Sequence, residues 1–162
     1  MEKTTPSKRP QLIGIADNIR SLHNVGALFR TADGAGVEAL ILCGITGQPP
    51  RNEIRKTALG AEDFVPWQYR ENTLSAIKEL KTAGYHIIAL EKNDHSQLLY
   101  EIELQLPVAL IAGNEYWGIS NEVLNEADSI VHVPMFGQKI SLNVSVAFGI
   151  AAYEIKRQIG TS

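Results

Sequence analysis

Apolar and polar stretches follow one another along the chain in a way that predicts strands and helices in turn. Continuous apolar runs predict buried strands at residues 12–16, 37–43, 85–90, 107–112 and 130–133. Unbroken apolar runs, rather than alternating ones, are typical of parallel strands that are covered on both faces. Because helical segments separate these runs, the pattern predicts a single α/β fold.

Apolar residues at helical spacing predict the segments between the strands. A first helix is expected from Asn24 to the glycine-containing segment 33–36. A second is expected from an Asn72 cap to about Ala83. A polar helical turn is expected within residues 51–60, a short strand at 64–67 stopped by Pro66, and a short helix through Leu124.

The C-terminal stretch reads as a loop that turns into a helix. Pro134 and Gly137 interrupt the chain after the last strand, and Ser141 or Asn143 can cap the helix that follows. This helix is expected to reach about Gln158. Residues 144–153 carry no charge and are apolar or small all round, so we expect the helix to be covered on more than one side, by a partner subunit.

Composition limits the class of protein. Its 162 residues are 44% hydrophobic and 20% charged, which predicts a globular domain at residues 11–162 behind a mobile, basic, proline-bounded tail at 1–10. Neither a signal peptide nor a membrane-spanning run is evident, and the single Cys43 fits a reducing compartment, so a cytoplasmic protein is expected. The net charge of −3 argues mildly against a nucleic-acid partner.

Arg30 lies one helical turn after Gly26, on a second face of the first predicted helix. A guanidinium beside a bare glycine backbone leaves room for a ligand. The alternative is a surface arginine paired with Asp33 or Glu38.

Residues 113–118, Gly-Asn-Glu-Tyr-Trp-Gly, follow an apolar strand and precede a helix, where open α/β sheets bind ligands. Their glycine spacing fits neither a dinucleotide fingerprint nor a P-loop. Glu115 could accept hydrogen bonds from a ligand or from loop amides, or it could cap the next helix. Ser141 and Asn143 likewise could hold a polar ligand or merely cap their helix. The four histidines are scattered without metal-ligand spacing, so no metal is expected.

Three of these stretches together resemble the SpoU (TrmH) branch of the SPOUT RNA methyltransferases. The segment 24–32 resembles that family's first motif, Asn-x-Gly followed by Arg; 111–120 resembles the second, Gly-x-Glu-x-x-Gly; and 133–145 resembles the third. Their order and the C-terminal place of the last are specific, and the resemblance covers about residues 12–159.

The resemblance implies a parallel-sheet α/β domain with a deep C-terminal trefoil knot, whereas chains are as a rule unknotted. It also implies a homodimer packed through the C-terminal helix. S-adenosylmethionine is the implied cofactor. The cofactor-binding positions that the resemblance implies are Ala112, Gly113, Val133, Met135, Ser141 and Leu142.

The implied reaction methylates a ribose 2'-hydroxyl of RNA. The residues implied to form the catalytic site are Asn24, Arg30, Glu115, Ser141 and Asn143. Arg30 would help to remove the hydroxyl proton, although a guanidinium carries donors and no acceptor. Two interpretations stay open: Arg30 is perturbed enough to act as a base, or it grips a phosphate and promotes ionisation by its charge. We favour the second.

Many relatives carry an extra RNA-binding domain, whereas here only the short tail precedes the first predicted strand, so we expect the catalytic dimer itself to hold the RNA. The cations expected to do so are Arg9, Arg20, Arg51, Arg55 and Lys56. Small relatives often modify tRNA, so tRNA is favoured over rRNA. Two alternatives are a non-catalytic RNA-binding or assembly protein with the same fold, and a small-molecule enzyme that mimics the motifs. The joint presence of Arg30, Glu115, Ser141 and Asn143 argues against a pure binder.

Overall fold

A computed structural model describes residues 9–160 and contains one parallel sheet of seven strands. Its order is β3-β2-β1-β6-β4-β7-β5, and every neighbouring pair within it is parallel. The strands are β1 (Leu12–Asp17), β2 (Ala39–Cys43), β3 (Trp67–Arg70), β4 (His86–Leu90), β5 (Gln97–Leu98), β6 (Val108–Ala112) and β7 (Ser129–His132). All residues of β1 and β6 are buried, as expected for central strands covered on both faces. The predicted α/β class and the parallel sheet are confirmed.

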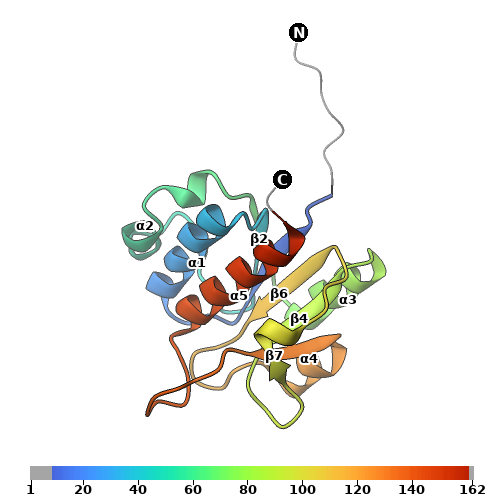
Figure 1. Ribbon diagram of the computed structural model, residues 1–162. Helices are drawn as coiled ribbons and strands as arrows, with labels where there is room; N and C mark the ends of the chain where they lie inside the picture. The colour runs from blue at the N-terminus through green and yellow to red at the C-terminus, as the bar shows by residue number, and fades with distance from the viewer. Residues whose placement is uncertain (1–8, 161–162) are drawn as a thin grey trace.

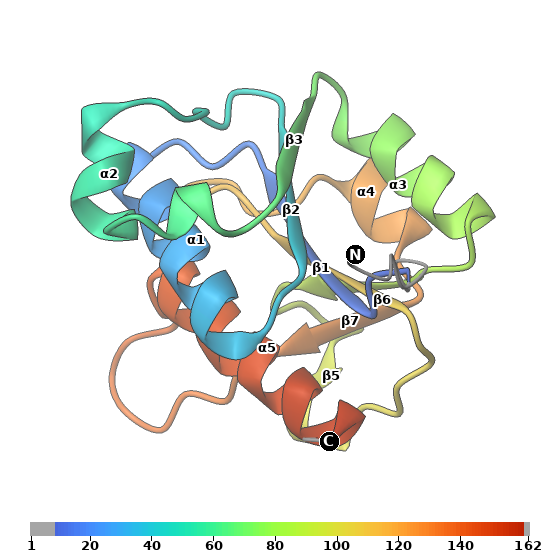
Figure 2. The ribbon, with the colours of Figure 1, turned by 90° about the horizontal axis from the view of Figure 1, so that it is seen from above.

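Helices cover both faces of the sheet (Figures 1 and 2). One face carries α1 (Leu22–Ala35), α2 (Asn52–Ala58) and α5 (Val144–Ile159), and the other carries α3 (Thr73–Thr82) and α4 (Asn121–Glu126). Phe29 of α1 and Phe148 of α5 lie in the core of the first face, and Ile77 and Val123 in that of the second. None of the helices in the described part of the chain is long and apolar enough to span a membrane.

The prediction of a strand at residues 64–67 is wrong, because β3 begins only at Trp67, the last residue of the predicted range. Residues 61–63 form a 3₁₀ turn, η1 (Ala61–Asp63), and Phe64 is exposed. Pro66 has no N–H to donate to a ladder, so pairing with β2 starts only at Trp67. The two-residue β5 and the 3₁₀ turn η2 (Leu99–Glu101) were not predicted, since segments this short carry no periodicity.

Helix α1 starts two residues before the predicted position. Ser21 is its N-cap, and its side chain accepts a hydrogen bond from the backbone N–H of Asn24. The Asn24 side chain therefore does not cap the helix and can bind elsewhere. The predicted end is confirmed, because Gly36 follows the last turn in a left-handed conformation, with φ of 74°.

Gly26 does not leave room for a ligand, and that prediction is corrected. It is buried where α2 crosses α1, and a Cβ there would run into Thr57 Oγ1 and the Ile54 carbonyl oxygen. The missing side chain lets the two helices approach closely, so Gly26 serves helix packing while Arg30, one turn on, remains exposed.

The register of the ladders brings the carboxyl ends of the strands to one edge of the sheet. Leu90 of β4 lies opposite both Ala112 of β6 and Val131 of β7, so the loops that follow these strands start side by side. Of the tail predicted at 1–10, residues 1–8 lie outside the described part. Arg9 and Pro10 contact the Ala83–Tyr85 region at the other edge. The trefoil knot stays a prediction.

Candidate active site

The Glu115 carboxylate joins the loop after β6 to the start of α1. Its Oε1 accepts from the backbone N–H of Arg20 at 2.8 Å. Its Oε2 accepts from the backbone N–H of Ser21 at 2.8 Å and from the side-chain amide of Asn24 at 2.9 Å. Glu115 therefore accepts from amides at the start of α1 and does not cap α4, whose N-cap is Ser120.

The pKa of Glu115 reflects two opposing influences. Burial, the larger single influence, raises the pKa. Hydrogen bonds from Arg20, Asn24, Ser21 and the residue's own N–H together lower the pKa by more than burial raises it, so the net pKa lies below the ordinary value. The group is a carboxylate around neutral pH and acts here as an acceptor.

Asn143 connects the third motif to this cluster. Its side-chain amide donates to Asn24 Oδ1 at 3.2 Å, while its Oδ1 accepts from the backbone N–H groups of Ser145 and Val146. The predicted cap of the C-terminal helix is confirmed, because Asn143 is the N-cap of α5. Asn143, Asn24 and Glu115 form a continuous hydrogen-bonded line, so the structure joins the three predicted motifs.

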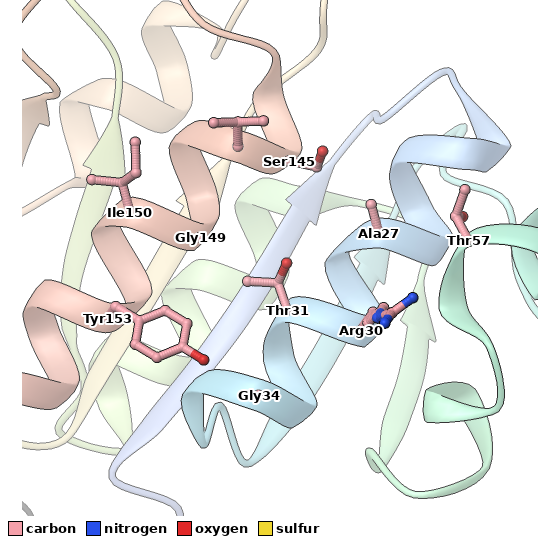
Figure 3. A pocket seen from close by; sticks show the side chains of 10 residues that line it. Ala27, Arg30, Thr31, Gly34, Thr57, Ser145, Gly149, Ile150 and Tyr153 are labelled. Atoms are coloured by element: carbon pink, nitrogen blue, oxygen red, sulfur yellow. The ribbon is translucent and has the colours of Figure 1, made fainter.

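Arg30 borders a groove of about 690 Å³ between α1 and α5 (Figure 3). The groove is lined by two helical stripes and one residue of α2: Ala27, Arg30, Thr31 and Gly34; Val146, Gly149, Ile150 and Tyr153, with Ser145; and Thr57. Within residues 9–160 the Arg30 guanidinium has no hydrogen-bond or salt-bridge partner, so the alternative pairing with Asp33 or Glu38 is not observed. It is an exposed cation beside neutral groups.

Sequence reasoning missed the other residues of this groove, although a signal existed. Residues 27, 30, 31 and 34 follow the spacing i, i+3, i+4, i+7, and so do 146, 149, 150 and 153. Each set is therefore one stripe of a helix. Small or polar residues on one stripe of a helix whose other faces pack in the core indicate that this stripe faces a ligand or another chain.

Ala112 and Gly113 end β6 at the same edge. Gly113 is buried, and a Cβ on it would lie 2.9 Å from the backbone of Gly118, so the absence of a side chain lets the 113–119 loop fold back on itself. Glu91, which follows β4, fixes the far end of this loop by accepting from the Ile119 N–H at 2.7 Å. The loop is thus tied to its neighbours at both ends.

The loop after β7 carries the remaining predicted cofactor positions. Val133 and Met135 are half-buried, whereas Ser141 and Leu142 are more exposed. The backbone groups of residues 134–142 have no hydrogen-bond partner within the described part of the chain. This loop therefore presents unpaired amides and carbonyls next to apolar side chains.

The predicted RNA-binding cations do not all gather at the site. The backbone of Arg20 lies beside Glu115. Arg55 and Lys56 are exposed on α2 and Arg51 is exposed at its N-cap; α2 packs on α1 and contributes Thr57 to the Arg30 groove. Arg9 instead stacks on Tyr85, and its guanidinium donates to the Ala83 carbonyl. Arg20 is therefore at the candidate site and Arg9 is not, while Arg51, Arg55 and Lys56 are exposed at the neighbouring α2 but do not line the Arg30 groove. No cluster of three or more potential metal ligands is found within residues 9–160.

A family profile and the most similar relatives indicate the same protein family. A profile described as the SpoU rRNA Methylase family matches residues 11–153. The chain is 33% identical over 158 residues to a tRNA (guanosine(18)-2'-O)-methyltransferase of Aquifex aeolicus, covering 98% of this chain and 74% of the relative. It is 36% identical over 149 residues to a 23S rRNA (guanosine-2'-O-)-methyltransferase of Neisseria meningitidis, covering 92% of this chain and 59% of the relative.

A solved structure agrees with this fold. The AdoMet-bound rRNA methyltransferase of Sinorhizobium meliloti superposes with a TM-score of 0.86 at 31% identity, over 95% of this chain and 59% of that one. The resemblance drawn from the three motifs is confirmed, and the chain belongs to the SpoU rRNA Methylase family.

Proposed function

We propose that the protein transfers a methyl group from S-adenosylmethionine to a ribose 2'-hydroxyl of RNA. The observation that carries this proposal is the line from Asn143 through Asn24 to Glu115, which joins three motifs at the carboxyl edge of the sheet. Open α/β sheets bind ligands at this edge. The names of the relatives support the reaction class, since they include 2'-O-methyltransferases acting on tRNA and on 23S rRNA.

The residues present fit S-adenosylmethionine. An adenine ring needs backbone donors and acceptors beside apolar surface, and the loop 134–142 offers unpaired backbone groups next to Met135 and Leu142. We assign the holding of the cofactor to Ala112, Gly113, Val133, Met135, Ser141 and Leu142. When bound, the cofactor supplies a methyl group activated by a sulfonium.

Arg30 is proposed to hold the RNA phosphate next to the target ribose. A guanidinium has five donors and no acceptor, and it recognises phosphate in a fork geometry. The exposed Arg30 has no competing carboxylate within the described residues, so its charge is available to RNA. A positive charge beside the hydroxyl favours the ionised form of that hydroxyl, and the proton then leaves to another acceptor.

Glu115 is proposed to position the site rather than to accept the proton. Both of its oxygens already accept hydrogen bonds, from two backbone N–H groups and from Asn24. Asn24 is then oriented by Glu115 on one side and Asn143 on the other. Accurate placement of the reacting groups contributes a large part of the rate acceleration of methyl transfer, because the reaction needs in-line geometry.

The RNA substrate is proposed to be tRNA. Two tRNA (guanosine(18)-2'-O)-methyltransferases are matched over 98% of this chain and over 74% and 80% of their own length. The 23S rRNA relatives are matched over less of theirs, 59% for the Neisseria protein. Arg20, Arg51 at the N-cap of α2, and Arg55 and Lys56 on α2 would contact the RNA backbone. A tRNA substrate would fit a cytoplasmic protein, and we propose the cytoplasm as its place of action.

A second copy of the chain is proposed to cover the outer face of α5. Val146 and Tyr153 are 50% and 56% exposed on a helix that has no charge between residues 144 and 153. Gly34 and Gly149 line the same groove without side chains, so another helix can approach closely there. This places two Arg30 grooves at the proposed dimer interface.

The proposed function is tested by mapping ribose methylation in cells that lack the gene. The expected result is the loss of one alkali-resistant ribose position in tRNA, restored by the wild-type gene and not by Arg30→Ala. An unchanged 2'-O-methylation map in both tRNA and rRNA would overturn the proposal. Loss of a 2'-O-methylated position in rRNA alone would support the proposed reaction and would identify rRNA, not tRNA, as the substrate.

A further inference from the structure

Two large aromatic side chains stand exposed directly after Glu115. Tyr116 is 75% and Trp117 64% exposed, although burial of such side chains stabilises a fold more than burial of most others. They lie neither in the hydrophobic core nor in the Arg30 groove. The two are neighbours in the chain and follow Glu115 directly, so together they make one apolar surface next to the candidate site.

The backbone beneath these side chains is fixed. Asn114 is only 4% exposed, and its Oδ1 accepts from the N–H groups of Tyr116 at 2.7 Å and Trp117 at 3.2 Å. Its side-chain amide donates to the Asn18 carbonyl at 2.8 Å, and the Gly118 N–H returns to the Asn114 carbonyl at 3.0 Å. Both aromatics are therefore displayed from a tight turn, which lowers the cost of ordering them on binding.

The Arg20 guanidinium lies next to the aromatic pair. The Arg20 guanidinium lies 5.1 Å from the centroid of the Tyr116 ring, and the Arg20 backbone N–H is held by Glu115. The same carboxylate thus fixes the backbone before α1 from which the Arg20 side chain extends. Since the chain as a whole carries a net charge of −3, an anionic ligand needs such a local positive group.

We propose that Tyr116, Trp117 and Arg20 form a stacking platform for an unpaired RNA base next to the target ribose. This rests on the proposed function. Aromatic rings stack on any nucleobase, and arginine adds attraction for the base and the phosphate. A ribose in a loop is reachable when its neighbouring base leaves the helical stack. The platform would hold that base while Arg30 grips the phosphate and Glu115 keeps Asn24 in position.

The test measures methyl transfer to unmodified tRNA by Tyr116→Ala, Trp117→Ala and the double variant. Stacking is worth roughly 1–3 kcal/mol per base, so each single change is expected to raise KM for tRNA roughly 5- to 150-fold. Tyr116→Phe and Trp117→Phe keep an aromatic face and are expected to stay near wild type. Tyr100→Ala, 54% exposed on η2, is the matched control and should change nothing.

Binding of S-adenosylmethionine and oligomeric state are measured on the same variants. Unchanged cofactor binding with raised KM supports the platform. Wild-type KM in both alanine variants overturns it, and so does dissociation of a dimer by either variant, which would assign the aromatics to a subunit contact. If wild-type protein transfers no methyl group to any RNA, the proposed function itself fails, and this outcome is distinct because it does not depend on the variants.

Fluorescence gives a second measurement that does not need turnover. The chain has two tryptophans, so a Trp67→Phe background leaves Trp117 as the only one. A short single-stranded RNA is expected to quench this emission as a base stacks on the indole. Quenching that is absent while the same RNA binds, as judged by sedimentation, contradicts the proposal.

Discussion

The side-chain amide of Asn24 donates to the Glu115 carboxylate at 2.9 Å across 91 residues of sequence. Asn24 lies in the first turn of α1, which follows β1, and Glu115 lies in the loop after β6, the strand that pairs with β1. The contact is what turns separate motifs into one site, because Asn143 reaches the same Asn24 from the start of α5.

Replacing Glu115 by glutamine should weaken both fold and site. A glutamine keeps one acceptor oxygen and turns its NH₂ group toward N–H donors that the carboxylate now satisfies. Leaving such donors unpaired costs about 1–3 kcal/mol in the free energy of unfolding. Urea titration measures the loss, and Glu122→Gln, an exposed change on α4, is the control that should stay near wild type. Equal stability of both variants would contradict the linking role of Glu115.

The pH dependence of that effect has a definite sign. The folded-state pKa of Glu115 lies below its ordinary value of 4.5, because hydrogen bonds outweigh burial. The carboxylate therefore stabilises the fold above pH 4.5, and this contribution is lost as the pH falls through the lower folded-state pKa. The difference in unfolding free energy between wild type and Glu115→Gln should shrink as the pH is lowered from 7 through that range. A difference that grows on acidification would reverse the assignment.

Asn143 has two functions that substitution can separate. Its oxygen caps α5, and its amide donates to Asn24. Asn143→Ala should cost about 1 kcal/mol of stability and lower methyl transfer. Asn143→Asp keeps the capping oxygen but has no amide donor, so stability should return while activity stays low. Full activity in the aspartate variant would show that the link to Asn24 is dispensable.

Gly26→Ala should destabilise the protein through the contact of α1 with α2. The new methyl group would meet Thr57 and the Ile54 backbone, and separating the helices costs about 1–3 kcal/mol. Thermal unfolding checks this. Gly34→Ala in the same helix meets only the hydroxyl end of Tyr153, at 3.0 Å, and should remain within about 1 kcal/mol of wild type. Similar melting temperatures for the two variants would remove the packing explanation.

The sequence could predict what depends on local pattern. Continuous apolar runs located the main strands, and Asn72, Asn143 and Gly36 marked helix ends because capping depends on neighbouring residues. The three motifs identified the family. Arg20 and Asn24 meeting Glu115 could not be predicted, because hydrogen bonds across more than ninety residues leave no periodic signal.

Gly26 shows a different limit. A glycine on a helix is compatible with an open face and with a close helix contact, and the sequence does not distinguish them. The position of α2 in the structure shows that Gly26 serves the close contact between the two helices. The exposed Tyr116 and Trp117 were visible in the sequence as aromatics in a polar loop, but their exposure depends on the turn that the buried Asn114 makes.

The most direct measurement is transfer of labelled methyl from S-adenosylmethionine to tRNA by the purified protein, with Arg30→Ala and Arg30→Lys alongside. The account predicts label in tRNA at an alkali-resistant ribose, a rate reduced about 10²–10³-fold in Arg30→Ala, and partial recovery in Arg30→Lys. Free guanidinium ion at low concentration should partly rescue the alanine variant, since charge is what Arg30 supplies. Label that appears on a base rather than a ribose, or an Arg30→Ala enzyme of wild-type rate, would contradict the account.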